Sequence, residues 1–466
     1  MFWRRDPNKK YIKIANELDK TGKGFCLAKW NMVTIHLHTG DNHSCYHPSM
    51  HRVSVEEVKE NPAALHNSKY KKQQRKMMLE GERPQECSYC WALEDLGQIS
   101  DRHLRSWEFE EKNSSLNEIK NLPWDADVYP RYMELSFGSE CQMKCMYCAP
   151  TISSAWEGEI KKHGEYPLEY LPNRRQYAIN PKGRTVYKEE DNPYIDAFWK
   201  WFPECYKHLN TLRVTGGEPL LSSNFIKMLD YIEENPRPDL QFAINSNMSV
   251  PQRNLDRFIA RAKSLKENNK VKEIMLYTSV DTWGAQAEYI RNGLDLEQWE
   301  RNVHRYLDEV PNSKLGFMIT VNLLSIYNFE ELLDKILELR EKYNTIFNRR
   351  IQMDTPYLLE PPHLSLQIAN DEQIQRLYRA IDYMNTQVDN LSYKKFDSTE
   401  LSKFQRVAKW AEDNRYGPDL LPTIRRDFVS FVDEHDKRRG TSFLTTFPKM
   451  VNEYNRWKLL ADKIVS

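Results

Sequence analysis

The sequence has no net charge, because its 67 lysine and arginine residues are balanced by 67 aspartate and glutamate residues. Proteins that bind nucleic acid or an anionic membrane usually carry an excess of positive charge. The basic run at 69–75, KYKKQQR, is a local exception, and such a run is more often a solvated helix face. We therefore expect neither nucleic acid nor a membrane among the partners of this protein.

Long apolar runs are missing as well. No stretch approaches the ~20 apolar residues of a membrane span. Residues 1–6, MFWRRD, do not begin the apolar region of a signal peptide. Internal repeats and low-complexity tracts are also absent from the sequence. With 40% hydrophobic residues over 466 positions, the chain is long enough for about two or three domains. These features favour a cytoplasmic protein.

Cysteines are few, but most of them are grouped. Three of the eight, Cys141, Cys145 and Cys148, follow a predicted strand with the spacing C-x3-C-x2-C. Three thiolates can hold a cubane 4Fe-4S cluster and leave one iron open to a further ligand. A zinc site would instead require paired C-x2-C units and four ligands. The triplet therefore predicts an iron-sulfur cluster with an open iron, and grouped thiols suit a reducing compartment.

A glycine-rich turn, TGGEPLL, follows the next predicted strand. Gly216 and Gly217 allow close approach of the backbone to a ligand, and the carboxylate of Glu218 can accept a hydrogen bond from an ammonium group. A β-branched side chain at Gly217 should therefore weaken ligand binding and leave the cysteine ligands untouched. By itself this turn has little meaning, but it lies downstream of the cysteine triplet.

The two motifs together, with Tyr147 just before the last cysteine, resemble the signature of the radical S-adenosylmethionine (radical SAM) superfamily. This resemblance implies that the open iron binds the amino and carboxylate groups of SAM and that the GGEP turn at Glu218 receives the amino group. The reduced cluster would then cleave SAM to a 5′-deoxyadenosyl radical, which removes a hydrogen atom from the substrate.

The resemblance also implies further SAM contacts. It places Tyr147 beside the adenine, Asn247 in the SAM pocket, Ser279 at the ribose, Arg291 at the carboxylate and Asn322 near the adenosine. An arginine fork fits a carboxylate bidentately. The alternatives are that Ser279 and Asn322 cap the ends of strands and that Arg291 forms a surface ion pair.

Short apolar runs alternate with helical patterns after residue 131, which is typical of an α/β fold with parallel strands. The predicted strands are 132–137, 212–214, 241–244, 273–280, 315–321 and 351–358. Six βα units match the partial (βα)6 TIM-like barrel of the radical SAM core. In such barrels ligands bind on the loops after the carboxyl ends of the strands, and both motifs follow predicted strands. We predict an auxiliary cluster domain at 1–112, a linker at 113–130, the barrel at 131–365 and a helical C-terminal extension at 366–466. Its predicted helices are 371–387, 401–413, 419–434 and 446–464.

Four more cysteines precede the triplet, namely Cys26, Cys45, Cys87 and Cys90. Four thiolates with one C-x2-C pair can fully ligate a second 4Fe-4S cluster or a zinc ion, and the sequence does not separate these metals. The pattern resembles the twitch domain, a short relative of the SPASM domain that holds an auxiliary 4Fe-4S cluster. Here it precedes the barrel, as in a subgroup that includes phage-encoded proteins. Cys205 has no partner by spacing, and we expect a buried thiol.

The resemblance favours an oxidoreductase-like radical SAM enzyme that modifies a peptide or protein residue and receives electrons from a flavodoxin- or ferredoxin-like reductant. A small-molecule dehydrogenase or cyclase acting on sugars or nucleotides is the alternative, and a non-catalytic iron-sulfur or zinc protein is the third. The sequence names no general acid or base, although Asp281, Asp354 and Glu360 lie near strand ends. The long insertion at 158–192 predicts either a substrate-contacting lid or a disordered surface loop.

Overall fold

The computed structural model describes residues 8–179, 183 and 185–465, which form two compact units. The first unit comprises Met1–Gly138, Val186–Thr215 and Asp239–Gln241, and the second comprises Ser139–Thr185, Gly216–Pro238 and Phe242–Ser466. The domain boundaries predicted at residues 112, 130 and 365 are not tested by this division and stay predictions.

The first unit contains a mixed sheet. Its strands are β1 (Met32–His36), β2 (Asp41–His43), β3 (His51–Arg52), β4 (Tyr132–Ser136) and β6 (Thr211–Thr215). β1 and β6 both pair with β4 in parallel, and β2 runs antiparallel to β1 and β3. Side chains alternate along β4, so that Met133 and Leu135 are fully buried while Tyr132 and Glu134 lie partly exposed on the opposite face.

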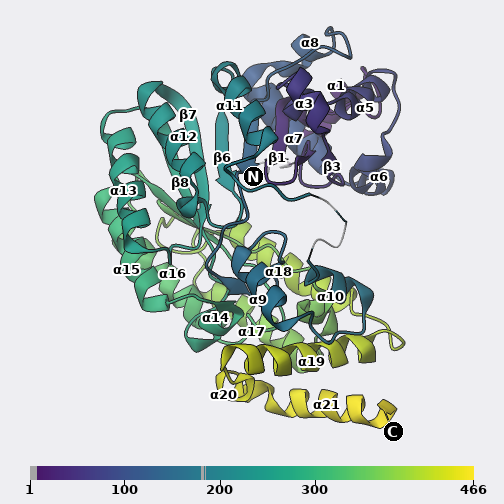
Figure 1. Cartoon of the computed structure of the whole chain (residues 1–466), viewed down its shortest axis with the longest axis vertical. Helices are drawn as coiled ribbons and strands as arrows, with labels where there is room; N and C mark the ends of the chain where they lie inside the picture. The colour runs from purple at the N-terminus through teal and green to yellow at the C-terminus, as the bar shows by residue number, and fades with distance from the viewer. Residues whose placement is uncertain (1–7, 180–182, 184, 466) are drawn as a thin grey trace, which may run out of the picture. The chain divides into compact units, whose positions relative to one another are not determined.

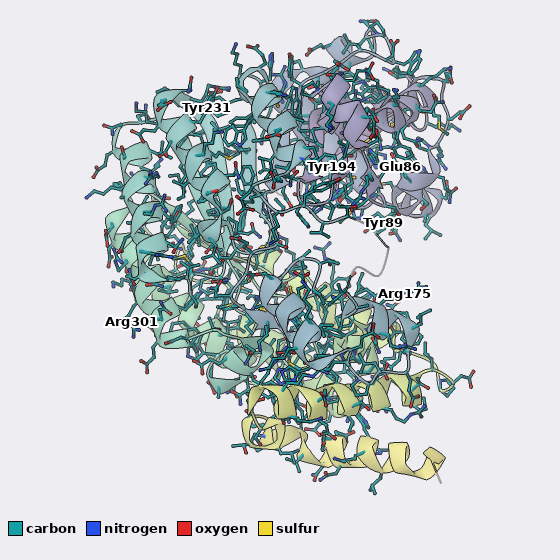
Figure 2. The ribbon with its side chains drawn as sticks, in the orientation of Figure 1. Glu86, Tyr89, Arg175, Tyr194, Tyr231 and Arg301 are labelled. Carbon is teal, nitrogen blue, oxygen red and sulfur yellow. The ribbon has the colours of Figure 1, made fainter. Side chains whose placement is uncertain are left out.

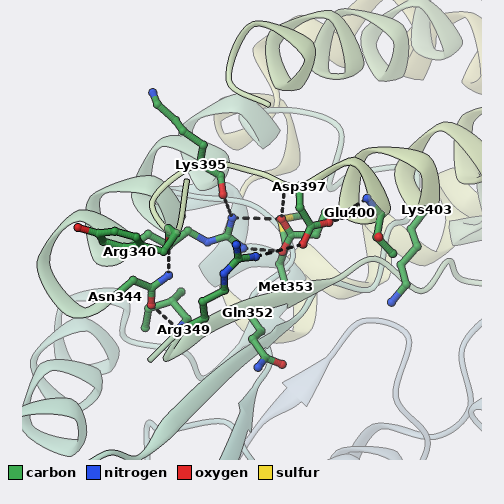
Figure 3. Close-up of a pocket in the computed structure, with 12 residues that line it drawn as sticks. Arg340, Asn344, Arg349, Gln352, Met353, Lys395, Asp397, Glu400 and Lys403 are labelled. Atoms are coloured by element: carbon green, nitrogen blue, oxygen red, sulfur yellow. Dashed lines mark hydrogen bonds and ion pairs between the residues drawn. The ribbon is translucent and has the colours of Figure 1, made fainter. Parts of the chain in front are cut away.

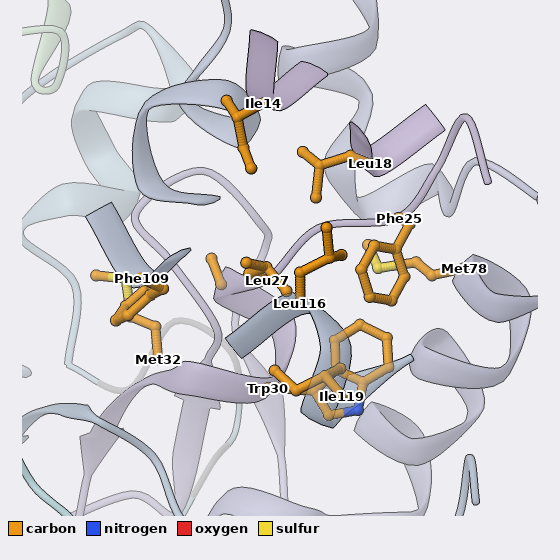
Figure 4. Close-up of a cluster of buried hydrophobic side chains, with 11 residues drawn as sticks. Ile14, Leu18, Phe25, Leu27, Trp30, Met32, Met78, Phe109, Leu116 and Ile119 are labelled. Atoms are coloured by element: carbon orange, nitrogen blue, oxygen red, sulfur yellow. The ribbon is translucent and has the colours of Figure 1, made fainter. Parts of the chain in front are cut away.

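Helices cover the first unit around a small hydrophobic core. The helices are α1 (Lys9–Asp19), α2 (Ala28–Asn31), α3 (Val55–Glu60), α4 (Ala64–Asn67), α5 (Lys69–Leu79), α6 (Ser88–Asp95), α7 (Asp101–Asn113), α8 (Ser115–Ile119) and α11 (Pro193–Tyr206). Leu18, Phe25 and Trp30 lie at the centre of this core, and Figure 4 shows Leu116 and Ile119 of α8 packed into it. The predicted linker therefore contains a helix whose apolar side chains are buried.

The basic run at 69–75 is a solvated helix face only in part, with Lys69, Tyr70 and Gln73 exposed. It lies in α5, where the side chains of Lys71 and Arg75 are buried. The Lys71 ammonium donates to the Met32 carbonyl oxygen at 2.9 Å, and Arg75 Nη1 donates to Asn67 Oδ1 at 2.8 Å. The expectation was wrong for these two residues, because their long apolar stems pack inside while their polar ends meet hydrogen-bond partners.

The second unit carries most of the βα alternation. Its strands are β7 (Arg237–Ser246, of which Asp239–Gln241 belong to the first unit), β8 (Val271–Thr278), β10 (Lys314–Met318) and β11 (Ile351–Asp354). β8 and β11 both pair with β10 in parallel. The intervening helices are α12 (Ser223–Glu234), α13 (Gln252–Glu267), α15 (Leu296–Glu309) and α16 (Phe329–Tyr343), which Figure 1 shows in teal and green.

These helices form for reasons that are visible in their sequences. In α15, Trp299, Val303 and Tyr306 recur every three or four residues and are buried, so the helix presents one apolar face. Asp295 begins the helix by accepting a hydrogen bond from the Gln298 backbone N–H at 2.8 Å. All six predicted strands are present, which confirms a mixed α/β fold with parallel strands, and closure into a partial barrel stays a prediction.

Shorter elements complete the second unit. They are α9 (Ser154–His163), α10 (Leu171–Gln176), α14 (Ala285–Ile290) and the antiparallel pair β5 (Lys144–Cys145) and β9 (Arg291–Asn292). The C-terminal helices are α17 (Asp371–Thr386), α18 (Ser398–Asp413), α19 (Leu421–Arg439), α20 (Phe443–Thr446) and α21 (Val451–Val465). The four helices predicted in this region are present, although the last one begins later than predicted, after Pro448. Within the described residues, no helix has both the length and the apolar character that crossing a membrane requires.

Candidate iron-sulfur and SAM site

The cysteine triplet lies in the second unit, on a loop that leads into α9. Backbone hydrogen bonds fix this loop: the Cys141 N–H donates to Ser154 Oγ at 3.1 Å, and the Met146 N–H donates to the Ile290 carbonyl at 2.8 Å. Cys145 lies in β5 directly opposite Arg291 in β9. The loop is therefore ordered by the protein itself.

Burial raises the pKa of all three thiols. The pKa of Cys141 rises to about 12, and that of Cys148 rises further because the thiols of Cys145 and Cys141 lie nearby. Thiols in such a place stay protonated until a metal displaces their protons. Three neighbouring thiols on one loop fit a cluster with an open iron, although no group of three or more ligating side chains in the described chain is close enough to hold a single metal ion.

The glycine turn touches the cysteine loop. Gly216 has a φ of 128°, which favours glycine. A Cβ atom at Gly217 would lie 2.3 Å from the carbonyl oxygen of Glu140, the residue before Cys141. The backbone N–H of Glu218 donates to the same oxygen at 2.7 Å. The two motifs therefore meet through their backbones, and the second glycine is required by this contact.

The Glu218 carboxylate is buried and engaged by the protein. Ser246 Oγ donates to it at 2.8 Å, the Asn247 N–H at 2.7 Å and the Leu220 N–H at 3.1 Å. Burial raises the pKa of Glu218 to about 7. This side chain therefore ties the glycine turn to the end of β7.

Asn247 joins the same junction. Its side-chain Oδ1 accepts a hydrogen bond from Gln142 Nε2 at 3.0 Å, and its Nδ2 lies 4.0 Å from the sulfur of Cys141. Gln142 was not nominated from the sequence, because a glutamine between two cysteines carries no signal of its own.

Arg291 lies in a buried ion pair. Its Nε and Nη2 donate to the two carboxylate oxygens of Asp281 at 3.0 and 2.9 Å, and Tyr147 Oη donates to Asp281 Oδ2 at 2.7 Å. Arg291 Nη1 lies 3.7 Å from the sulfur of Cys145. Only 6% of Arg291 is exposed, so the alternative of a surface ion pair is wrong. Asp281 orients both Arg291 and Tyr147 at the cysteine loop.

The two remaining candidates lie at strand ends. Ser279 follows β8 and is partly exposed. Asn322 is buried, accepts hydrogen bonds from the N–H groups of Leu324 and Ser325 at 3.0 and 3.1 Å, and donates to the Thr320 carbonyl at 2.8 Å. The Asn322 side chain thus stabilises its own turn, which agrees with the capping alternative.

The described part of the 158–192 insertion supports the cysteine loop. Gln176 Nε2 donates to the Tyr147 carbonyl at 3.0 Å, and Tyr177 Oη donates to the Met146 carbonyl at 2.8 Å. The alternative of a disordered loop is therefore wrong for this part, while residues 180–182 and 184 lie outside the described chain. Neither residue had a sequence signal, because their partners are backbone atoms about thirty residues away.

The four other cysteines lie together in the first unit. Cys26, Cys45 and Cys87 pack against its hydrophobic core. Burial, together with the nearby Cys26 thiol, raises the pKa of Cys45 to about 12 and that of Cys90 to about 12. The thiols are therefore near enough to influence one another, and a metal would have to displace their protons.

Two buried cations flank these thiols. Lys29 pairs with Glu86, which is labelled in Figure 2, and the thiols of Cys87 and Cys45 help to raise the Lys29 pKa to about 12. Arg102 donates to the Phe25 carbonyl at 3.1 Å, next to Cys26, and its charge lowers the Cys26 pKa against the effect of burial. Positive charges in these places would balance the negative charge of a four-thiolate metal centre.

A polar network lies beside Cys45. Tyr46 Oη and Tyr132 Oη are 2.6 Å apart, and both donate to the Glu134 carboxylate, at 3.2 and 3.1 Å. Arg213 Nε lies 3.6 Å from the same carboxylate. This network supplies acid-base groups that sequence reasoning did not nominate, since only the parallel pairing of β4 with β6 brings Arg213 to Glu134.

A separate cavity of about 240 Å³ lies between β11 and α18 (Figure 3). Arg340 and Glu400 form a two-pronged ion pair inside it. None of the predicted site residues lines this cavity, so it is not part of the candidate site.

No protein-family model matches the chain. A segment of 122 residues is 30% identical to a GTP 3′,8-cyclase of Nautilia profundicola, and this match covers 25% of the chain and 27% of that protein. The chain thus matches only about a quarter of the length of this curated relative. A match of this extent shows similarity to part of that enzyme, and it does not reach the substrate class or the auxiliary domain.

Proposed function

We propose that this protein is a radical SAM enzyme whose 4Fe-4S cluster is held by Cys141, Cys145 and Cys148. The observation that carries this proposal is the contact between the two motifs. The Glu218 N–H donates to the carbonyl of Glu140, directly before Cys141. A ligand on the open iron would therefore lie next to the glycine turn.

When bound, such a cluster supplies the electron that cleaves SAM to methionine and a 5′-deoxyadenosyl radical. The chain's own residues have three tasks. Gly217 permits the turn to approach the cysteine loop, and Asn247 lies against the Cys141 sulfur. Arg291 and Tyr147, oriented by Asp281, place a guanidinium and a phenol beside Cys145. The guanidinium would attract the SAM carboxylate, and the ring would pack on the adenine.

The four cysteines of the first unit would hold an auxiliary 4Fe-4S cluster, in a twitch-like domain, with zinc as the alternative. Lys29 and Arg102 would offset part of the negative charge of either metal centre, and each is also paired with a carboxylate, Lys29 with Glu86 and Arg102 with Glu94. An auxiliary cluster could accept the second electron of an oxidation or bind the substrate. A flavodoxin- or ferredoxin-like protein would supply the first electron.

Two substrate classes are candidates, each for a different reason. Modification of a peptide or protein residue rests on the resemblance to twitch-bearing enzymes. Nucleotide chemistry, including cyclisation, is favoured by the partial match to a GTP 3′,8-cyclase. Incubation of the reduced enzyme with GTP and SAM, followed by mass spectrometry, separates these classes, because only the second consumes the nucleotide.

The cluster assignment makes the first prediction. Protein reconstituted anaerobically with iron and sulfide, and then reduced, should convert SAM to 5′-deoxyadenosine. Cys145→Ala should abolish this conversion, since it removes one of three ligands. Cys205→Ala is the matched control, because Cys205 is fully buried and lies outside both groups. Chromatography of 5′-deoxyadenosine measures the result, and undiminished cleavage by Cys145→Ala would contradict the assignment.

A further inference from the structure

The C-terminal helix α19 ends beneath the cysteine loop. Its Arg439 Nη1 donates to the carbonyl of Lys144 at 2.9 Å, and Lys144 directly precedes Cys145. The guanidinium carbon of Arg439 lies 4.6 Å from the ring centre of Trp156, whose Nε1 donates to the Cys145 carbonyl at 2.8 Å. The Arg439 side chain is only 1% exposed. A buried positive charge therefore contacts the peptide before Cys145 directly, and it reaches the Cys145 carbonyl through Trp156.

A buried carboxylate accompanies this charge. Glu159 accepts hydrogen bonds from Arg439 Nε and Nη2 at 3.0 and 3.1 Å, from Lys144 Nζ at 2.7 Å and from Tyr166 Oη at 2.7 Å. The arginine fork is thereby fixed in one orientation. Glu159 and Arg439 are 280 positions apart in the sequence, so the tertiary structure alone creates this pair.

A second contact anchors the same end of α19. Asp436 accepts a hydrogen bond from Tyr289 Oη at 2.8 Å, and Tyr289 lies two residues before Arg291. The helix end therefore contacts the segments that lead into both β5 and β9, which carry Cys145 and Arg291.

We propose that Arg439, held by Glu159, is a positioning residue that orients the Cys145 peptide and raises the reduction potential of the cluster. This inference rests on the proposed function, because it concerns the cluster on the same three cysteines. Reduction adds one negative charge to the cluster, and a fixed positive charge in a low-dielectric site favours the reduced form.

Opposite substitutions test this proposal. Arg439→Gln removes the positive charge and should lower the potential, while Glu159→Gln removes the negative charge and should raise it. We expect a shift of the reduction equilibrium of about tenfold in each direction, which is ~59 mV for one electron. Arg439→Lys should keep the wild-type potential, since it retains the charge. A dithionite titration of the reconstituted protein, followed by electron paramagnetic resonance of the triple-thiolate cluster, measures these values.

Arg438→Gln is the matched control. This variant loses the same charge, but Arg438 pairs with Glu434 at 2.7 Å and donates to the Gly164 carbonyl at 3.0 Å. Its guanidinium packs on the ring of Tyr166, so it reaches Glu159 only through that residue. The reduction potential of the cluster in Arg438→Gln should equal that of the wild type. If the Arg439→Gln variant retains no cluster, the reduction potential of Glu159→Gln compared with that of Arg438→Gln still gives the sign of the effect.

Shifts of opposite sign in the two Gln variants support the proposal. Shifts in the same direction, or none, overturn it, because loosening of the loop alone would affect both variants alike. Absence of the cluster or of SAM cleavage in the wild type is a different result, which would overturn the proposed function itself.

Discussion

At the scale of single residues, two close contacts hold the candidate site together. One is the approach of Gly217 to the Glu140 carbonyl, and the other is the pairing of Arg291 with Asp281. The first revises an expectation from the sequence. A larger side chain at Gly217 would reach the residue before Cys141, so it would disturb the cluster loop as well as SAM binding.

We therefore predict that Gly217→Ala lowers both the iron content and the SAM affinity of the reconstituted protein. The new Cβ would lie 2.3 Å from a backbone oxygen, and the loop would have to move. Gly158→Ala is the control, because open space surrounds that position in α9 and alanine favours a helix. Iron analysis and equilibrium dialysis measure the two quantities. Normal iron content with weak SAM binding would instead restore the original expectation.

Glu159 gives a prediction about pH. Burial alone would raise its pKa, but Arg439 and Lys144 lower it from 4.5 to about 2. A carboxylate whose pKa is lowered on folding stabilises the protein above its unfolded pKa, and this stability is lost as pH falls from 4.5 towards 2. The loss is ~3 kcal/mol for a shift of this size.

The test compares the metal-free wild type with Glu159→Gln by urea unfolding between about pH 3 and pH 7. The wild type should be the more stable at neutral pH, and the difference should shrink as the solution becomes acidic. A difference that stays constant with pH would show that the pKa of Glu159 is the same in the folded and the unfolded protein.

At the scale of elements, α19 organises the segments that support the cysteine loop. Besides Arg439, it carries Asp427, which is 1% exposed. The Asp427 carboxylate accepts hydrogen bonds from the N–H groups of Glu169 and Tyr170 at 2.7 and 3.0 Å and from Asn173 Nδ2 at 2.7 Å. These contacts hold the start of α10, whose last residue donates to the Tyr147 carbonyl.

Asp427→Ala should therefore destabilise the protein by ~2–3 kcal/mol, because it leaves three donors without their acceptor. Lys437→Ala on the same helix is the control, since its side chain is 78% exposed and its ion pair with Glu434 should contribute under ~1 kcal/mol. Chemical unfolding measures both changes. Equal effects of the two substitutions would show that α10 is not held by Asp427.

At the scale of the whole molecule, the cysteines divide between the two compact units. Cys26, Cys45, Cys87 and Cys90 belong to the first unit, and the triplet belongs to the second. Because each unit has its own set of thiols, removal of one set should leave the other metal centre in place.

The variant with Cys141, Cys145 and Cys148 all changed to alanine tests this independence. If the first unit holds a 4Fe-4S cluster, iron should fall from about eight to about four atoms per chain. If it holds zinc, the variant should keep about one zinc and no iron. Elemental analysis with Mössbauer spectroscopy distinguishes these results. Loss of all metal would contradict an independent second centre, and the zinc result would remove the electron-acceptor role.

The sequence by itself determined the features that depend on near neighbours in the chain. The spacing of the cysteines, the glycine turn and the six strands were all predicted, because side-chain periodicity and turn chemistry are local. Only the tertiary structure decided which side chains meet across the chain. Lys71 and Arg75 became buried, Asp427 met Asn173 at 254 positions' distance in the chain, and Arg439 reached a carbonyl 295 positions away. Contacts between distant positions leave no pattern in a single sequence, so only the folded chain reveals them.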